Sequence, residues 1–327
     1  MFVLGLMGSP RKQGNTDLLL GAFLDGAQGT GAEVLKVDVT SKHIAPCQGC
    51  RLCEKQGFCR FQDDDMGEMN YLLRKADIVV LATPIFFYGP SSQIKALIDR
   101  SQALWARRYI MKLTDPKAPF RRGFLLAVGA TKGKELFTGT SLVAKYFYDA
   151  VGARYEGFLG FRKVEAPGDI TRHPTALADA RKKAEELAGT LAGRKRALFL
   201  CRENACRSQM AEAFLQYHGG EQFDAQSAGD QPATEVNPQA IEAMAERGID
   251  LAYRRPKGMD MIEDRPFDLV VQMGCEMSCP LTPAGRVENW ELEDPAGRPL
   301  EFMRTIRDEI EKRVKLIIEE EGPEEIR

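Results

Sequence analysis

One segment in the C-terminal half constrains this chain more than any other feature of its sequence. The apolar run Ala197–Leu200 leads directly into Cys201-Arg-Glu-Asn-Ala-Cys-Arg207-Ser208, and apolar residues at helical spacing follow, namely Met210, Ala213, Phe214 and Tyr217. A strand, a loop and a helix in this order direct backbone N–H groups and the helix N-terminus toward one point. The pattern predicts an α/β domain with an anion-binding loop at 201–208.

The residues of this loop are those of a nucleophilic site. Cys201 and Arg207 are six positions apart, so the guanidinium can close the loop and hold two oxygens of a tetrahedral anion. The same positive field favours the thiolate of Cys201, which is the nucleophilic form. Ser208 is placed to donate to that thiolate, and Asn204 suits the left-handed backbone that such a loop needs. We predict a thiolate enzyme acting on an oxyanion; the alternative is a buried cysteine beside a surface arginine.

The length of 327 residues suits two domains. In the first half, the apolar runs Phe2–Met7, Ile78–Ala82 and Phe124–Val128 alternate with helical patterns, and a last apolar stripe ends at Gly193. Strand and helix alternation predicts a doubly wound parallel sheet. A second unit of the same kind begins at 197, so we expect two doubly wound α/β domains, at 1–193 and 197–327.

The composition and charge of the chain do not favour nucleic acid or a membrane surface as a partner. A formal net charge of −2 gives no reason to expect nucleic acid or a membrane surface. No apolar run approaches the roughly 18 residues that cross a bilayer, and the apolar start lacks a basic segment before it. We therefore expect a cytoplasmic protein. Its eight cysteines fall into three tight groups, which in a cytoplasmic chain favours metal binding or redox chemistry.

With its strand, loop and helix, the segment 197–318 resembles the low-molecular-weight phosphotyrosine phosphatase superfamily. The resemblance implies that Cys201 is the nucleophile, that Arg207 and the loop amides bind the anion, and that Asp294, followed by Pro295, is the general acid. The family includes both phosphatases and arsenate reductases, which bind arsenate or a phosphate-like oxyanion.

Several details are similar to the arsenate reductases. Gln209 follows Ser208 where phosphatases usually have proline, and Ala296-Gly297 follow Asp294-Pro295 where phosphatases often have aromatic residues. Cys275 and Cys279 lie where arsenate reductases hold resolving cysteines, although their spacing is narrower than in the thioredoxin-coupled enzymes. The resemblance implies that one of them attacks Cys201, that arsenite leaves, and that a partner such as thioredoxin reduces the disulfide.

Three loops in the first half follow predicted strands. Gly8–Thr16 carries small hydroxyl and amide residues before a helix, which suits a terminal phosphate. The second loop is rich in aromatic residues, and the third begins at Gly129. Together they resemble the NADPH-dependent FMN reductase and iron–sulfur flavoprotein family, with a flavodoxin-like fold, over roughly 1–160. The resemblance implies NADPH as reductant, a homo-oligomer, and FMN bound through these residues: Ser9, Arg11, Asn15 and Thr16 at the phosphate, and Pro84, Ile85, Phe86, Phe87, Tyr88, Gly89 and Gly129 near the ring.

Four cysteines form a compact group, Cys47-x2-Cys50-x2-Cys53-x5-Cys59. Thiolates at this spacing can converge on one cluster, and the motif matches that of iron–sulfur flavoproteins, which implies a [4Fe-4S] cluster. The alternatives are a zinc site, or cysteines without metal that are free thiols or disulfides.

The two halves together suggest an arsenate reductase coupled to an FMN-dependent NAD(P)H oxidoreductase domain. Two other functional hypotheses remain open at this point. One is a protein-tyrosine phosphatase regulated by a redox-sensing flavodoxin-like module. The other is a flavin oxidoreductase whose C-terminal unit is a thiol relay.

Overall fold

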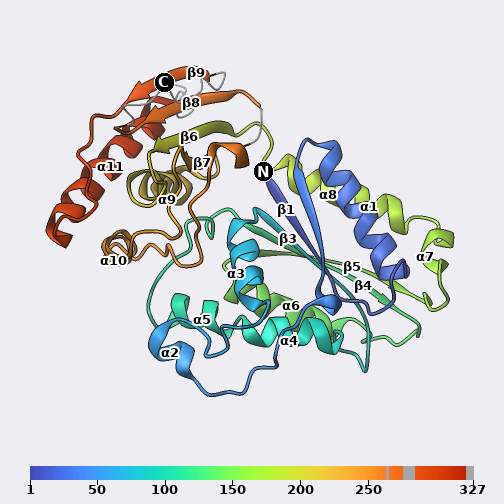
Figure 1. Cartoon of the computed structure of the whole chain (residues 1–327). Helices are drawn as coiled ribbons and strands as arrows, with labels where there is room; N and C mark the ends of the chain where they lie inside the picture. The colour runs from blue at the N-terminus through green and yellow to red at the C-terminus, as the bar shows by residue number, and fades with distance from the viewer. Residues whose placement is uncertain (263–264, 275–283, 322–327) are drawn as a thin grey trace. The chain divides into compact units, whose positions relative to one another are not determined.

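The computed structural model describes residues 1–262, 265–274 and 284–321, which form two compact units (Figure 1). The first unit comprises Met1–Lys112 and Phe120–Ala192, and the second comprises Leu113–Pro119 and Gly193–Arg327. Each unit is a parallel sheet with helices, so the expected fold class of two parallel-sheet α/β domains is confirmed.

The first unit is built on a five-stranded parallel sheet of order β2-β1-β3-β4-β5. Its strands are β1 (Phe2–Met7), β2 (Glu33–Asp38), β3 (Ile78–Pro84), β4 (Arg122–Gly129) and β5 (Arg154–Arg162). The central strands β1, β3 and β4 are buried almost throughout, as their unbroken apolar sequences require. The strand order reverses at β1, so the loops after β1 and β3 flank the switch point where ligands of such sheets bind.

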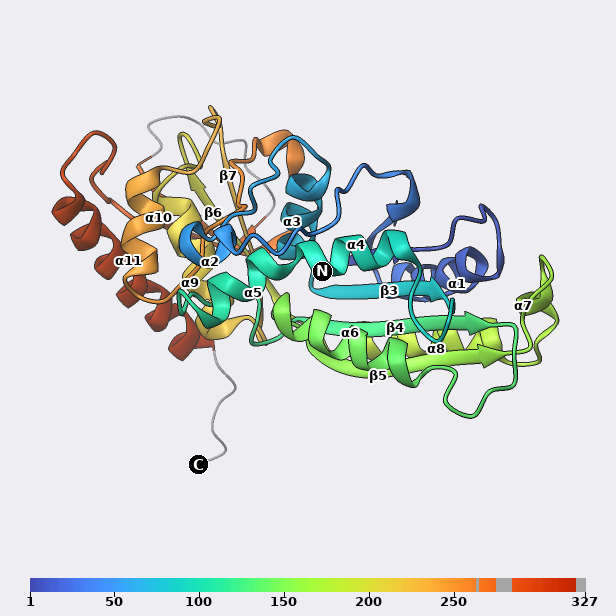
Figure 2. The same cartoon turned by 90° about the horizontal axis from the view of Figure 1, so that it is seen from below.

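Helices cover both faces of this sheet. Helices α1 (Asn15–Gly29) and α8 (Ala176–Gly189) pack side by side on one face, while α3 (Met66–Lys75), α4 (Ser92–Arg100) and α6 (Thr138–Ala150) lie on the other (Figures 1 and 2). The connections contain further short helices, which are η1 (Val39–Ser41), α2 (Leu52–Gln56), α5 (Gln102–Tyr109) and α7 (Asp169–Arg172). Stacked rings of Phe23 and Phe124, with centroids 5.8 Å apart, join α1 to the sheet.

The second unit has a four-stranded parallel sheet of order β7-β6-β8-β9. Its strands are β6 (Lys195–Cys201), β7 (Phe223–Gly229), β8 (Phe267–Gln272) and β9 (Ala284–Asn289). The short segment Leu113–Pro119 belongs to this unit, because the Thr114 backbone exchanges hydrogen bonds of 2.7 and 2.8 Å with Gly248 and Asp250. Here the order reverses at β6, which places the loop after Cys201 at the switch point.

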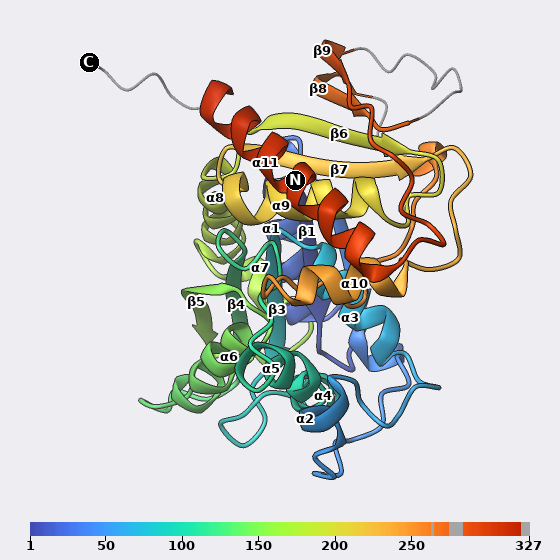
Figure 3. The same cartoon turned by 90° about the vertical axis from the view of Figure 1, so that its left-hand side faces the viewer.

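Helices α9 (Arg207–Gly219) and α11 (Leu300–Glu321) pack together on one side of the second sheet, and α10 (Pro238–Ala245) packs against α11 (Figure 3). Their shared core includes Phe199, Phe214 and one side of α11, whose buried residues are Met303, Ile306, Ile310, Val314 and Ile317. The opposite face packs a smaller cluster against the segment around η2 (Met259–Met261). Among the described residues, no helix is both long and apolar enough to span a bilayer.

Candidate active site

The loop after β6, which was predicted to bind an anion, lies between a buried strand and a buried helix. β6 ends at Cys201 and the thirteen-residue α9 begins at Arg207. Asn204, at the turn of the loop, has φ +49°, the left-handed conformation that the sequence predicted. Gly229 on β7 permits the tight packing, because a Cβ there would lie 2.5 Å from the Arg202 carbonyl oxygen. The backbone is thereby fixed around the space in front of Cys201.

A chain of hydrogen bonds orients the Ser208 hydroxyl toward Cys201. The Lys257 N–H donates to Asn204 Oδ1 over 2.8 Å, and Asn204 Nδ2 donates to Ser208 Oγ over 2.8 Å. Ser208 Oγ therefore already accepts a hydrogen bond, and it lies 3.0 Å from Cys201 Sγ. The serine hydrogen is therefore free to be donated to the sulfur of Cys201.

Arg207 and Asp294 meet at the same loop. The Arg207 side chain is almost fully buried, donates to the Leu292 carbonyl oxygen over 2.8 Å, and lies 3.0 Å from Asp294 Oδ2. Its Nε is buried with no hydrogen-bond partner among the described residues. Asp294 is 57% exposed at its side chain, so a proton can reach it from solvent. The predicted anion-binding arginine and the predicted general acid are therefore adjacent.

The second unit contains three further cysteines, of which the structure describes only Cys206. Cys206 is buried within the loop, and burial together with the neighbouring Cys201 raises the pKa of its thiol to about 12. A thiol with that pKa is a poor nucleophile near neutral pH. Cys275 and Cys279, the candidate resolving cysteines, lie outside the described residues.

A buried polar network behind the loop was not found from the sequence. Glu212 on α9 accepts a 2.5 Å hydrogen bond from Ser227 and lies 3.4 Å from Lys257 and 3.5 Å from Arg254. Burial alone would raise the pKa of Glu212, but the two cations lower it below its ordinary value. The sequence did contain a signal for this network, because the polar residues Ser208, Glu212 and Gln216 repeat every four positions. The structure shows that all three are buried on α9. Polar residues on a buried helix face indicate a satisfied network.

In the first unit, the loop between β1 and α1 contains the predicted phosphate ligands. Ser9 and Thr16 are buried, and Ser9 Oγ accepts from the Arg11 N–H over 3.2 Å. Gly14, at the N-cap of α1, has no side chain with which to cap the first turn, which suits an anion at that helix end. Asn15 instead binds the segment that follows β5, through Ala166 (2.9 Å) and Ile170 (3.2 Å). Arg11 is exposed and donates to the Glu165 carbonyl oxygen.

The aromatic loop after β3 projects from the same edge of the sheet. Phe86 and Gly89 exchange backbone hydrogen bonds of 2.9 Å, which close a turn whose central residues Phe87 and Tyr88 have φ of +49° and +62°. The rings of Phe86, Phe87 and Tyr88 are exposed. Gly129 ends the neighbouring strand β4. Exposed aromatic rings at a switch point suit a flat, partly apolar ligand.

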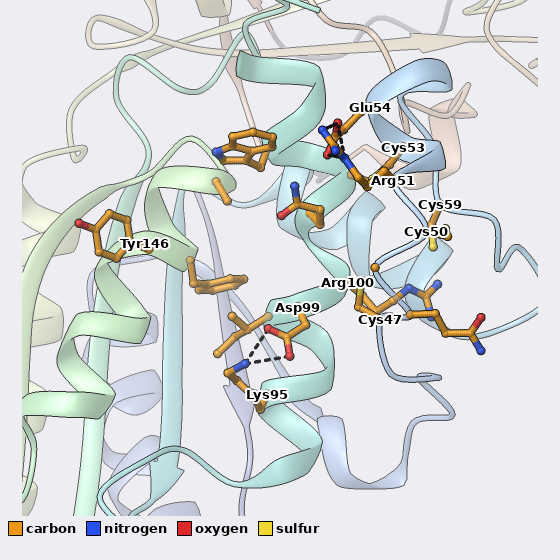
Figure 4. Close-up of a pocket in the computed structure, with 18 of the residues that line it drawn as sticks. Cys47, Cys50, Arg51, Cys53, Glu54, Cys59, Lys95, Asp99, Arg100 and Tyr146 are labelled. Atoms are coloured by element: carbon orange, nitrogen blue, oxygen red, sulfur yellow. Dashed lines mark hydrogen bonds and ion pairs between the residues drawn. The ribbon is translucent and has the colours of Figure 1, made fainter. Parts of the chain in front are cut away.

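The four-cysteine group lines a cavity of about 740 Å³ in the first unit. Left-handed residues Arg51 and Gly57 bound the short helix α2, which turns the segment back so that Cys47, Cys50, Cys53 and Cys59 all face this cavity (Figure 4). Among the described residues, no group of three or more histidine, cysteine, aspartate or glutamate side chains is close enough together to hold a metal ion as the structure stands. The donor set nevertheless fits an iron–sulfur cluster, since four thiols reach one cavity beside a buried arginine with an unused donor, Arg100 Nε.

Comparisons with known proteins match each half of the chain. The family model for low molecular weight phosphotyrosine protein phosphatases matches residues 196–324, and that for NADPH-dependent FMN reductases matches residues 1–137. The iron-sulfur flavoprotein of Methanocaldococcus jannaschii is 31% identical over 196 residues, which cover 58% of this chain and 96% of that protein. The glutaredoxin arsenate reductase of Synechocystis sp. is 35% identical over 127 residues, which cover 38% of this chain and 96% of that protein. The chain belongs to the iron-sulfur flavoprotein family through its first half and to the arsenate reductase family through its second half.

The arsenate reductase domain thus contains the cradle of Cys201, and the flavoprotein domain contains the four cysteines. A solved arsenate reductase in the phosphate binding state is 34% identical to this chain, covering 39% of this chain and 99% of the other, with a TM-score of 0.37. The proposed fusion of an FMN reductase-like domain with an arsenate reductase-type domain is confirmed.

Proposed function

We propose that this chain reduces arsenate to arsenite at Cys201 and takes the reducing equivalents from NADPH through its flavoprotein domain. The observation that carries the proposal is the cradle itself. Cys201 Sγ lies 3.0 Å from Ser208 Oγ, and Arg207 joins the loop to Asp294 with a 3.0 Å ion pair. The candidate nucleophile, cation and acid are therefore all held at this loop, where a tetrahedral anion would bind.

In the first step, the Cys201 thiolate attacks arsenic and forms a sulfur–arsenic bond. Arg207 and the loop amides hold the remaining oxygens, while Asp294 gives a proton to the departing oxygen, which leaves as water. A second thiolate, from Cys275 or Cys279, then attacks the Cys201 sulfur. The electron pair of the sulfur–arsenic bond passes to arsenic, so As(V) becomes As(III), arsenite leaves, and a disulfide remains.

Two sequence features favour arsenate reduction over hydrolysis of a phosphotyrosine. Hydrolysis needs a single thiolate that water regenerates, whereas reduction needs a second thiol, and this domain holds Cys275 and Cys279 in addition to Cys201. The residues after Asp294-Pro295 are Ala296-Gly297, which offer no aromatic wall for a tyrosine ring.

The flavoprotein domain would hold FMN at the carboxyl edge of its sheet. The buried hydroxyls of Ser9 and Thr16 and the N-terminus of α1 suit the phosphate, with Arg11 at the rim. Asn15 would position the adjoining segment through its bonds to Ala166 and Ile170. The turn Pro84–Gly89 and Gly129 would border the ring. When bound, FMN accepts a hydride from NADPH and supplies two reducing equivalents.

Cys47, Cys50, Cys53 and Cys59 would hold a [4Fe-4S] cluster, which passes single electrons. The name of the Methanocaldococcus relative supports this assignment. External thioredoxin or glutaredoxin would then assist the reaction without being required for it, and the flavoprotein domain would assemble as a homo-oligomer.

The test is arsenite production by purified protein with NADPH and arsenate, in the absence of thioredoxin, glutaredoxin and small thiols. We expect multiple turnovers that stop in Cys201→Ser. Arsenite at the level of that variant would reject internal electron delivery. The same preparation is assayed with an aryl phosphate, because strong hydrolysis with little arsenite would favour the phosphatase. If Cys201→Ser left every activity intact, the flavin oxidoreductase with a thiol relay would be favoured.

A further inference from the structure

Arg100, the last residue of α4, is buried against the four-cysteine segment. Its side chain has 0% exposure and forms an ion pair with Asp64, at 2.5 Å from Nη1 to Oδ2 and 3.1 Å from Nη2 to Oδ1. The same nitrogens donate to the carbonyl oxygens of Ala45 and Phe61, over 2.8 and 3.1 Å. These bonds anchor the chain on both sides of the cysteines, and they use only the two terminal nitrogens.

The third nitrogen, Arg100 Nε, is a buried donor that no described residue accepts. Buried donors in native proteins are almost always paired, so an orphaned one indicates a missing acceptor. Arg100 and Cys59 line the same cavity, and Figure 4 shows Arg100 on the side of the labelled thiols, away from Tyr146. Cys59 lies close enough to the Arg100 guanidinium for the two side chains to interact.

We propose that Arg100 Nε–H donates a hydrogen bond to the Cys59 sulfur when the four cysteines carry the iron–sulfur cluster, and that this bond raises the reduction potential of the cluster. The inference rests on the cluster assignment in the proposed function. A donor at a ligating sulfur stabilises the additional negative charge of the reduced cluster more than that of the oxidised one. Arg100 is thus a positioning residue that also sets the electron affinity of the site.

The charge of Arg100 alone does not account for this role. Asp64 neutralises it within hydrogen-bond distance, so the pair presents little net charge to the cavity. What distinguishes Arg100 from the other cations of the cavity is the burial of its free donor. Lys95 is paired with Asp99 at 2.7 Å and Arg51 with Glu54 at 2.8 Å, and both side chains are substantially exposed.

The test uses the full chain purified anaerobically, with iron measured first and all arginines labelled with nitrogen-15. The dithionite-reduced cluster is studied by pulsed electron paramagnetic resonance for coupling to an arginine nitrogen. We expect a coupling that persists in Arg51→Lys and Arg60→Lys, which change the other cavity arginines, and disappears in Arg100→Lys. If Arg100→Lys fails to fold, persistence in the other two variants still identifies Arg100.

The reduction potential of the cluster is the second quantity to measure. In Arg100→Lys we expect the reduced-to-oxidised ratio at fixed ambient potential to fall at least tenfold, which is 59 mV for one electron. Lys95→Met removes a charge from the same cavity and should change the ratio less than twofold. A wild-type cluster without nitrogen coupling, or a coupling retained in Arg100→Lys, overturns the role of Arg100 alone. Absence of iron from the wild-type protein overturns both this inference and the cluster assignment.

Discussion

Asn204 determines much of the geometry around the reactive thiol. It has a left-handed backbone, and its side chain bonds Ser208, Gln209 and the backbone of Lys257. Its removal leaves buried donors and acceptors unpaired, at about 1–3 kcal/mol each. We expect Asn204→Ala to lower the free energy of unfolding of its domain by about 2–5 kcal/mol and arsenate turnover at least tenfold.

The matched control for that prediction is Asn204→Gly, which tolerates positive φ but makes no side-chain hydrogen bonds. At neutral pH, iodoacetamide should alkylate Cys201 more slowly in both variants than in the wild-type protein. Equal reactivity of Asn204→Gly and wild type would show that backbone shape, and not the hydrogen-bond chain to Ser208, activates the sulfur.

Cys206 should be unreactive while Cys201 is labelled. Its pKa of about 12 keeps the Cys206 thiol protonated at neutral pH. We expect iodoacetamide at pH 8, followed by peptide mass spectrometry, to modify Cys201 and leave Cys206 intact. Because the folded-state pKa is raised, the stabilisation from the protonated thiol is complete below pH 9, the ordinary value, and is lost as the pH rises toward 12. Equal labelling of both cysteines at pH 8 would contradict this.

At the scale of elements, helix α9 supports the loop through its buried polar face. The buried Glu212 is held ionised by Lys257 and Arg254, so Glu212→Gln removes the carboxylate that pairs with these two half-buried cations. Breaking such a pair costs about 3–5 kcal/mol. We expect a loss of that size at pH 7, measured by urea unfolding with Trp290 fluorescence in a Trp105→Phe background.

The pH dependence of that loss has a defined sign. The folded-state pKa of Glu212 is lowered, so its stabilisation is present above the ordinary value of 4.5 and disappears as the pH falls below it. The difference between wild type and Glu212→Gln should therefore shrink in acid. A difference that is constant from pH 7 to pH 4 would show that the carboxylate charge contributes nothing.

The sequence predicted the central elements better than the outer ones. β1, β3, β4 and β6 contain the unbroken apolar runs of strands buried on both faces, and all four were predicted. The strands β2, β5, β7 and β9 were not singled out, because each lies at a sheet edge. Three of them, β2, β5 and β9, are largely exposed or half-buried, which removes the continuous hydrophobic signal.

The site was partly predictable for a similar reason. The residues of the 201–208 loop are local in sequence, so their spacing revealed them. The contacts of Asn15 with Ala166 and Ile170, and those of Glu212 with Ser227 and Lys257, join distant segments that only the fold brings together.

At the scale of the whole molecule, the two sheets have separate cores, so their activities should separate. We expect Ser9→Asp, which places a negative charge in the phosphate loop, to abolish FMN retention and NADPH-driven arsenite formation. With dithiothreitol as reductant, the same variant should form arsenite within twofold of wild type. Ser9→Thr is the control, since it keeps the hydroxyl. Loss of the dithiothreitol-driven reaction in Ser9→Asp would contradict independent domains.

The most direct measurement is a single turnover. Fully reduced protein, freed of external reductant and NADPH, is mixed with excess arsenate, and arsenite and disulfides are quantified together. We predict one arsenite per chain and a disulfide that joins Cys201 to Cys275 or Cys279, with neither formed by Cys201→Ser. Arsenite without a disulfide at Cys201, or no arsenite from protein whose Cys201 is reduced and accessible to alkylation, would contradict the account.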